Sequence, residues 1–185
     1  MLLADTVPLD RVIERLRATR SLFHSEADLQ HSFAVAVSKL DDALRVRLEV
    51  PFRDGRSTYL DVLVTNPVTG LSTAVELKYS TARLEVTDPL ADEQFRLRSH
   101  AADDLVRWGV VKDVERLERW ASPQRDGVSL LLTDVRSLWS KPADESTRDR
   151  AFRLHQGRRL SGDLVWGDGD DQPSDVLLAG SYTAD

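Results

Sequence analysis

The strongest constraint on the fold is a series of three predicted β-strands between residues 44 and 79. The stretch 44–52 alternates apolar and polar residues, which is typical of a strand with one buried face. Two further apolar stretches, 58–65 and 72–79, contain neither Pro nor Gly and are joined by the turn residues 66–70. These patterns predict a β-meander, whose second and third strands lie in the interior of a sheet.

The turn between the second and third strands predicts which residues face each other. If it closes symmetrically, Val62 pairs with Val75, and Asp61 faces Glu76. Directly opposed side chains have Cβ atoms about 4.5–5.5 Å apart, and two like charges there repel. Lys78 lies two residues beyond Glu76 and therefore on the same face. Because the flanking residues are apolar, the two carboxylates need a proton, a cation or a base to compensate them.

Two adjacent carboxylates with a lysine suit the hydrolysis of phosphodiesters. Mg²⁺ prefers oxygen ligands and keeps several waters, so Asp61, Glu76 and a phosphate are enough to hold it. A bound Mg²⁺ lowers the pKa of a water molecule and polarises a phosphoryl oxygen. Lys78 can orient that water or offset the growing negative charge. The cluster therefore predicts an enzyme that depends on Mg²⁺, with Mn²⁺ as a substitute.

A capping-box sequence, Ser-Glu-Ala-Asp at 25–28, predicts the start of a helix over 26–41. Glu26 lies on the same side of this helix as the apolar residues Phe33 and Val37. We therefore expect Glu26 to point towards the sheet and to support the acidic pair. The helix dipole alone also favours an acid in the first turn, so a purely structural role for Glu26 remains open.

The rest of the chain alternates helical and extended patterns, and the sequence as a whole predicts an α/β fold: a mixed sheet flanked by helices and extended by C-terminal strands. Asp88-Pro89 marks the expected start of the helical region after the meander. The expected elements outside the meander are an N-terminal helix at 9–20, the helix at 26–41, helices over 89–120, a buried strand at 128–133, and terminal strands at 152–155, 160–166 and 176–182.

Length and composition fit one domain over residues 1–185. We divide it into an N-terminal helix (1–24), a catalytic core (25–134) and a C-terminal β extension with an acidic loop (135–185). No apolar stretch is long enough to span a membrane, and the N-terminus does not have the pattern of a signal peptide. The absence of cysteine excludes disulfides, thiolate zinc sites and cysteine nucleophiles. A cytoplasmic location is the default expectation.

The net charge of −6 at first opposes a nucleic-acid partner, because phosphate backbones favour basic surfaces. Residues 161–185, however, hold six acids and no Lys or Arg, which leaves 25 acids and 25 bases in residues 1–160. We expect the acidic loop at 167–175 to lie away from the catalytic cleft, because like charge there would oppose binding. Candidate phosphate contacts are Arg45, Arg47, Arg53, Arg56, Arg96 and Arg98.

Asp61, followed by Glu76-Leu77-Lys78 on the next strand, with the helical Glu26 upstream, resembles the PD-(D/E)XK (restriction-endonuclease-like) nuclease superfamily. The resemblance covers about residues 25–134 and implies a core of the order α-β-β-β-α-β. It implies that Asp61 and Glu76 are metal ligands, that Lys78 serves the attacking water, and that Glu26 is an accessory ligand or a supporting acid. It favours DNA over RNA as the substrate and is compatible with a homodimer. The candidates on the helix after the lysine are Gln94 and His100.

Two other hypotheses remain open. Glu-x-Lys alone is a frequent pair on solvated surfaces, so the specificity comes from its combination with Asp61 on the facing strand. The first alternative is a nuclease-like module that binds DNA or protein without cutting. The second is an unrelated α+β interaction protein, in which Lys78 only neutralises the carboxylate pair. The four histidines lack the spacing of a zinc site, and no phosphate-binding P-loop is present.

Overall fold

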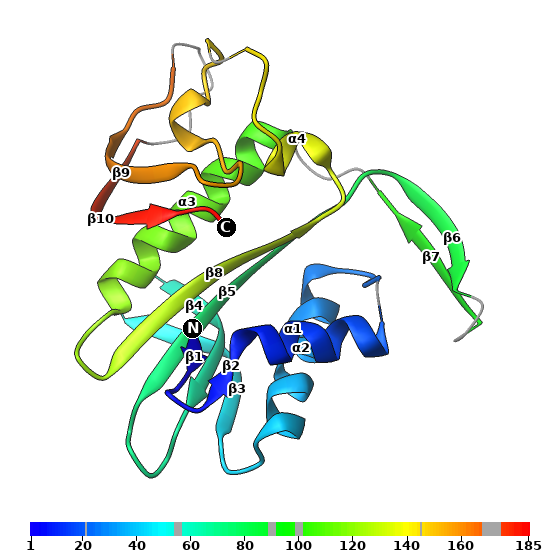
Figure 1. The fold of residues 1–185 in the computed structure, drawn as a ribbon, viewed down its shortest axis with the longest axis vertical. Helices are drawn as coiled ribbons and strands as arrows, with labels where there is room; N and C mark the ends of the chain where they lie inside the picture. The colour runs from blue at the N-terminus through cyan, green and yellow to red at the C-terminus, as the bar shows by residue number, and fades with distance from the viewer. Residues whose placement is uncertain (21, 54–56, 89–91, 99–101, 145, 168–174) are drawn as a thin grey trace.

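The protein has a mixed α/β fold built on a four-stranded sheet (Figure 1). A computed structural model describes residues 1–185 except 21, 54–56, 89–91, 99–101, 145 and 168–174. The strand order is β3-β4-β5-β8; β3, β4 and β5 are antiparallel neighbours, and β8 runs parallel to β5. The strands are β3 (Arg45–Arg53), β4 (Ser57–Thr65), β5 (Ser72–Ser80) and β8 (Arg125–Thr133). The three-stranded meander predicted from residues 44–79 is confirmed.

The N-terminal elements cover one face of this sheet. They are β1 (Leu2–Leu3), β2 (Val7–Pro8), α1 (Leu9–Thr19) and α2 (Glu26–Leu40). Helix α2 contacts β3, β4 and β5, and α1 packs on α2 (Figure 1). Buried Phe33 and Val37 of α2 join Val62, Val75 and Leu77 in one hydrophobic core. The apolar stripe predicted for this helix therefore does face the sheet.

Ser25 begins α2 as the sequence predicted. It has an extended backbone, and its side-chain oxygen accepts a hydrogen bond from the backbone N–H of Asp28 at 3.1 Å. This bond satisfies one of the N–H groups that the first turn of a helix leaves without a partner. The cap fixes where the helix starts and thereby where Glu26, its first residue, projects.

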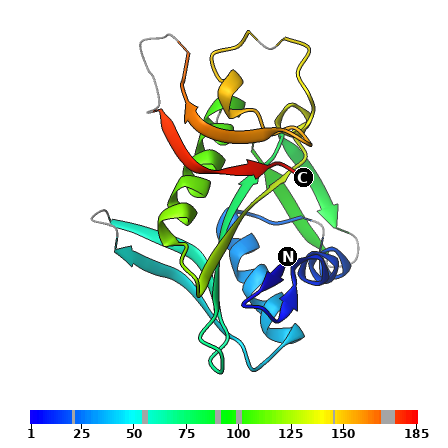
Figure 2. The ribbon, with the colours of Figure 1, turned by 60° about the vertical axis from the view of Figure 1, so that its left-hand side comes forward.

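Helix α3 (Asp103–Trp120) lies against the other face of the sheet (Figure 2). Its buried Leu117 packs on Leu60 and Leu63 of β4 and on Ala74 of β5. Gly127 of β8 permits this close approach, because a Cβ atom at that position would lie 2.6 Å from Leu117 Cδ2. The sheet is thus covered by α2 on one face and by α3 on the other.

The C-terminal segment forms a second layer outside α3. It contains α4 (Arg136–Trp139), a 3₁₀ turn η1 (Arg150–Phe152), and the antiparallel strands β9 (Arg159–Leu164) and β10 (Val176–Thr183). Phe152 and Val176 form a core with Val111 of α3. Helix α3 is therefore packed between the central sheet and the β9–β10 hairpin (Figures 1 and 2).

Glu118 of α3 connects this hairpin to the helix by hydrogen bonds. Its carboxylate accepts hydrogen bonds from the backbone N–H groups of Ala179 at 3.0 Å and Gly180 at 2.6 Å, and from the Tyr182 hydroxyl at 2.7 Å. The register of β10 shifts between Leu178 and residue 181, and the two bonded N–H groups lie within that bulge. Burial and the neighbouring carboxylate raise the pKa of Tyr182 to about 12, so its hydroxyl remains a donor.

Two predicted elements are wrong. The helical region expected from residue 89 begins instead at Asp103, and an antiparallel hairpin precedes it, formed by β6 (Leu84–Asp88) and β7 (Glu93–Leu97). Phe95 and Leu97 are buried while the residues between and beside them are exposed, so the pattern has a period of two. Residues 152–155, expected to form a strand, do not: Phe152 is the last residue of the 3₁₀ turn, and residues 153–155 have no regular structure. Most of the acidic loop at 167–175 lies outside the described residues.

Strand β3 forms one edge of the sheet. It contains Pro51, which has no backbone N–H to donate, and Glu49, whose φ of 49° is uncommon for a residue with a side chain. Arg45 and Arg47 on the same strand are exposed.

In the described part of the chain, no helix is long and apolar enough to cross a membrane.

Two glycines near α3 should respond in opposite ways to alanine. Gly127→Ala should lower the free energy of unfolding by about 1–3 kcal/mol, because the new methyl group overlaps Leu117. Gly109→Ala should raise it by up to about 1 kcal/mol, because Gly109 lies inside α3 and an added Cβ would meet only Lys78 Cε, at 3.8 Å. Denaturant titration of both variants measures this, and changes of the same sign would contradict the close packing of α3 on β8.

Candidate active site

The candidate site lies where β4 and β5 stop pairing. Their ladder joins Val62 to Val75 and continues to the turn, in the symmetric register predicted from the sequence. Beyond it, two N–H groups of β5 bond to side chains instead. The N–H of Leu77 donates to Asp61 Oδ2 at 2.7 Å, and the N–H of Tyr79 donates to Glu26 Oε2 at 3.0 Å. The two acids thus take the place of a neighbouring strand.

Asp61 is not paired in the β3–β4 ladder, because the pairing of these two strands is interrupted at that residue. The paired residues step from Leu48 with Val62 to Val50 with Leu60, passing over Glu49 and Asp61. Leu48 packs in the core under α2, whereas Val50 packs in the core under α3. The ribbon of β3 and β4 therefore twists over at this point, so that Leu48 faces α2 whereas Val50 faces α3. Glu49, between them, has a positive φ. Such backbone strain is concentrated at functional sites.

Glu76 is the buried centre of the cluster, with no exposed surface. Its Oε2 accepts a hydrogen bond from Arg116 Nη1 at 3.0 Å, while its Oε1 is buried without a hydrogen-bond partner. Burial raises the pKa of this carboxyl to about 8. The charges of Asp113 and Asp61 add to the rise, and those of Arg116 and Lys78 oppose it. An unpartnered carboxylate oxygen in such surroundings is costly unless a cation or a proton compensates it.

Lys78 extends from β5 to acids on both covering helices. Its Nζ lies 3.0 Å from Asp113 Oδ2 and 3.8 Å from Glu26 Oε1. Burial alone lowers the pKa of this ammonium group, but Asp113, Glu26 and Asp61 together outweigh burial and raise the pKa above its ordinary value. Lys78 is therefore a charged hydrogen-bond donor at neutral pH, with its position fixed between α2 and α3.

Helix α3 contributes two residues that the sequence prediction missed. Arg116 Nη2 donates to Asp113 Oδ1 at 2.7 Å, and Arg116 Nη1 also donates to the carbonyl of Tyr59 at 3.0 Å. Asp113 is almost fully buried, and burial raises its pKa. On a helical wheel Asp113 lies about 40° from Leu117 and about 60° from Val110, on the apolar side of α3. An acid on an apolar side, which identified Glu26, would have identified Asp113 as well.

The predicted residues fall into two groups. Glu26, Asp61, Glu76 and Lys78 come together, from α2, β4 and β5. Gln94 instead lies exposed on β7, where it pairs with Thr87, and it does not belong to a helix. His100 lies outside the described residues.

The carboxylates fit a hard divalent cation with few protein ligands. Among the described residues, no group of three or more His, Cys, Asp or Glu side chains is arranged to hold a metal ion. Asp61 and Glu76 offer two carboxylates, one of which has the unpartnered oxygen. Mg²⁺ is usually bound by one or two carboxylates and completes its octahedron with waters and phosphate oxygens. The donor set is therefore compatible with Mg²⁺ or Mn²⁺ and offers no sulfur or imidazole for softer metals.

Comparison of the chain with family models, with curated proteins and with solved structures finds no match. A fold alone does not determine a function, so the function has to be inferred from the geometry of this cluster.

The metal-free protein should lose stability as the pH rises towards 8. The pKa of Glu76 is about 8 in the folded protein against an ordinary 4.5, so the folded state holds this proton more tightly than the unfolded chain. The stabilisation is complete below pH 4.5 and disappears as the pH rises through 8, a loss on the order of a few kcal/mol. Thermal melts in chelator across this range measure it.

Glu76→Gln removes the titration while preserving the shape of the side chain, so its melting temperature should vary less with pH than that of the parent. Glu14→Gln, on the exposed side of α1, is the matched control and should keep the parental dependence. A metal-free parent whose stability rises between about pH 5 and pH 8 would contradict the raised pKa.

Proposed function

We propose that this protein is a divalent-cation-dependent nuclease of the PD-(D/E)XK type that acts on DNA. The observation that carries the proposal is the separation of β4 from β5, which gathers Asp61, Glu76, Lys78 and Glu26 at one point. Within that group a buried oxygen of Glu76 has no partner. Two acids, a charged lysine and an uncompensated carboxylate oxygen match the requirements of metal-assisted phosphodiester hydrolysis.

The order of the central elements supports the same proposal. Helix α2 is followed by β3, β4 and β5, then α3, then β8 parallel to β5. This order agrees with the α-β-β-β-α-β core of restriction-endonuclease-like proteins, with the β6–β7 hairpin as an insertion before α3. The agreement covers the same residues that carry the sequence resemblance.

Asp61 and Glu76 are the residues that would hold the cation. When bound, Mg²⁺ would polarise the scissile phosphate and make a coordinated water more acidic. Lys78 serves as a hydrogen-bond donor rather than as a base, because its acidic neighbours keep it charged. Its ammonium group orients the attacking water or stabilises the charge that develops on the phosphate oxygens. Glu26 and Asp113 hold the lysine from opposite sides of the sheet.

One observation favours a second candidate function. Arg116 already donates to Glu76, and Asp113 already pairs with Lys78, so the cluster is largely compensated without a cation. A nuclease-like module that binds DNA without cutting it could keep such a network for its own stability. The two candidates differ in their response to a divalent cation: the nuclease cleaves DNA when the cation is present, whereas the binding module does not cleave DNA in any condition.

Incubation with substrates separates the two candidates. Single-stranded, duplex and branched DNA and RNA are each incubated with Mg²⁺, Mn²⁺ or chelator. We expect cleavage of DNA with either metal and none with chelator. Binding of DNA without cleavage in all metal conditions would replace the nuclease by the binding module.

Lys78→Ala should lower the cleavage rate on the order of 10²–10³-fold while leaving cation binding and the fold intact. The carboxylates hold the ion, whereas the ammonium acts on the water and on the developing charge. Glu76→Ala should differ by losing cation affinity and activity together. The measurements are cleavage rate, calorimetric titration with Mg²⁺, and melting temperature with and without chelator.

Lys112→Ala is the matched control, because Lys112 lies on α3, next to Asp113 in the sequence, but pairs with Glu115 and not with a residue of the site. It should cleave at the parental rate. A Lys78→Ala protein that cuts as fast as the parent would remove Lys78 from the mechanism. Loss of folding in Lys78→Ala, with or without metal, would assign the lysine a structural role.

A further inference from the structure

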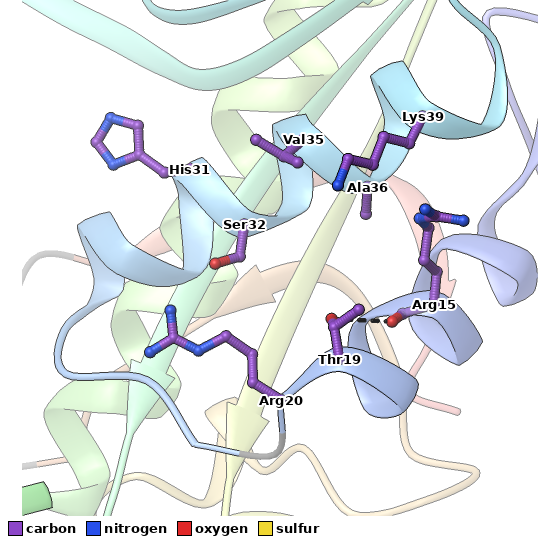
Figure 3. A pocket seen from close by; sticks show the side chains of 8 residues that line it. All are labelled: Arg15, Thr19, Arg20, His31, Ser32, Val35, Ala36 and Lys39. Carbon is purple, nitrogen blue, oxygen red and sulfur yellow. Dashed lines mark hydrogen bonds between the residues drawn. The ribbon is translucent and has the colours of Figure 1, made fainter. Parts of the chain in front are cut away.

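A groove with a positively charged lining lies between α1 and α2 (Figure 3). Its volume is about 270 Å³. Arg15 of α1 and Lys39 of α2 reach into the space between the helices, and Arg20 lies at the end of α1 (Figure 3). His31 of α2 also lines it, and none of the described residues that line it is acidic. The protein as a whole carries a charge of −6, so this concentration of cations is a local feature.

Two of these cations are available to an external partner. Arg20 is committed to Asp28, with 2.8 Å between Nη1 and Oδ1. Arg15 and Lys39, in contrast, have no ion pair with a carboxylate in the described part of the chain. Elsewhere buried or half-buried cations of this protein are mostly paired, as Arg107 is with Asp149. Unpaired cations facing each other across a groove repel, and a bound anion relieves that repulsion.

The groove and the candidate active site both include residues of α2. Asp28, the partner of Arg20, is in the first turn of α2, two residues after Glu26, and Glu26 contacts Lys78. His31 and Lys39 follow along the same helix. At 1.5 Å per residue they are about 12 Å apart along the helix axis, a span long enough for more than one phosphate of a nucleic-acid strand.

We propose that the α1–α2 groove binds the phosphate backbone of a nucleic acid through Arg15 and Lys39, along the helix that carries Glu26 of the candidate active site. This inference rests on the proposed function for its choice of ligand. An open groove suits an extended, negatively charged polymer better than an isolated small molecule, which usually binds in a concave pocket that buries most of its surface. Contacts to phosphates position a nucleic acid without reading its sequence. The groove therefore supplies affinity and alignment, and it leaves specificity to other residues.

The test measures DNA binding in chelator, where no cleavage occurs. The probe is a fluorescently labelled DNA duplex, and its single strand is tested separately, by anisotropy over a range of salt concentrations. Arg15→Ala/Lys39→Ala should bind about tenfold more weakly and have a shallower salt dependence, by about 0.7–0.9 in slope for each phosphate that is no longer neutralised. The single variant Lys39→Ala, at an exposed position, should show about half of that change in slope. Circular dichroism melts confirm that each variant is folded.

Arg150→Ala/Arg159→Ala is the matched control, because it removes the same charge from exposed residues of η1 and β9 that do not line the groove. It should bind DNA more tightly than the groove variant does. Equal weakening in both double variants would show a general effect of charge and overturn the proposal, as would parental binding by the groove variant.

Two further outcomes separate this proposal from the nuclease. A parent that binds DNA through Arg15 and Lys39 but cleaves nothing supports the groove and removes the catalytic claim. If the parent cleaves DNA and the groove variant binds DNA with full affinity, the nuclease proposal stands and the proposed DNA-binding role of the groove is wrong. Binding of poly-glutamate, but not of DNA, in a manner that depends on Arg15 and Lys39 would overturn the nucleic-acid ligand and point to an acidic protein partner.

Discussion

The candidate site depends on the need of buried backbone N–H groups for hydrogen-bond partners. Once β4 leaves β5 beyond Val75, the N–H groups of Leu77 and Tyr79 have no strand beside them, and carboxylates of Asp61 and Glu26 accept their bonds. The same requirement places an acid from the sheet and an acid from α2 along one strand. Glu76 and Lys78 alternate with the two bonded residues on that strand, so the four candidate side chains come together on helices and strands and not on a loop.

The charges around Glu76 are arranged at a cost to stability. Glu76, Asp113, Arg116 and Lys78 form a largely buried network, yet one oxygen of Glu76 is unpartnered. Buried ion pairs often contribute less stability than apolar residues of the same size. A buried and incomplete network of this kind supports the proposed metal-assisted chemistry, because strongly shifted pKa values are concentrated at functional sites.

The sequence predicted the parts of the protein that local patterns determine. Alternation and a symmetric turn predicted the meander and its register, and the capping box predicted the first residue of α2. The β4–β5 ladder ends at Val62 and Val75, one pair short of the predicted pairing of Asp61 with Glu76, and Asp61 instead accepts a hydrogen bond from the N–H of Leu77. The β6–β7 hairpin was missed because Phe95 and Leu97 fit either a period of two or the start of a helix, and Asp88-Pro89 favoured the helix. Asp113 and Arg116 were missed because an acid and a base three residues apart usually form a solvated surface pair; only the packing of α3 on β5 shows that they meet Glu76 and Lys78.

The edge strand β3 affects how the protein behaves in concentrated solution. A sheet edge with free N–H and C=O groups can recruit a strand from another molecule, which is a common route to aggregation. Pro51 removes one donor from this edge, and the positive φ of Glu49 bends the backbone away from a regular ladder two residues earlier. A second molecule could therefore form only a short, interrupted ladder with β3. The irregularity that frees Asp61 for the site also protects the exposed edge from strand addition.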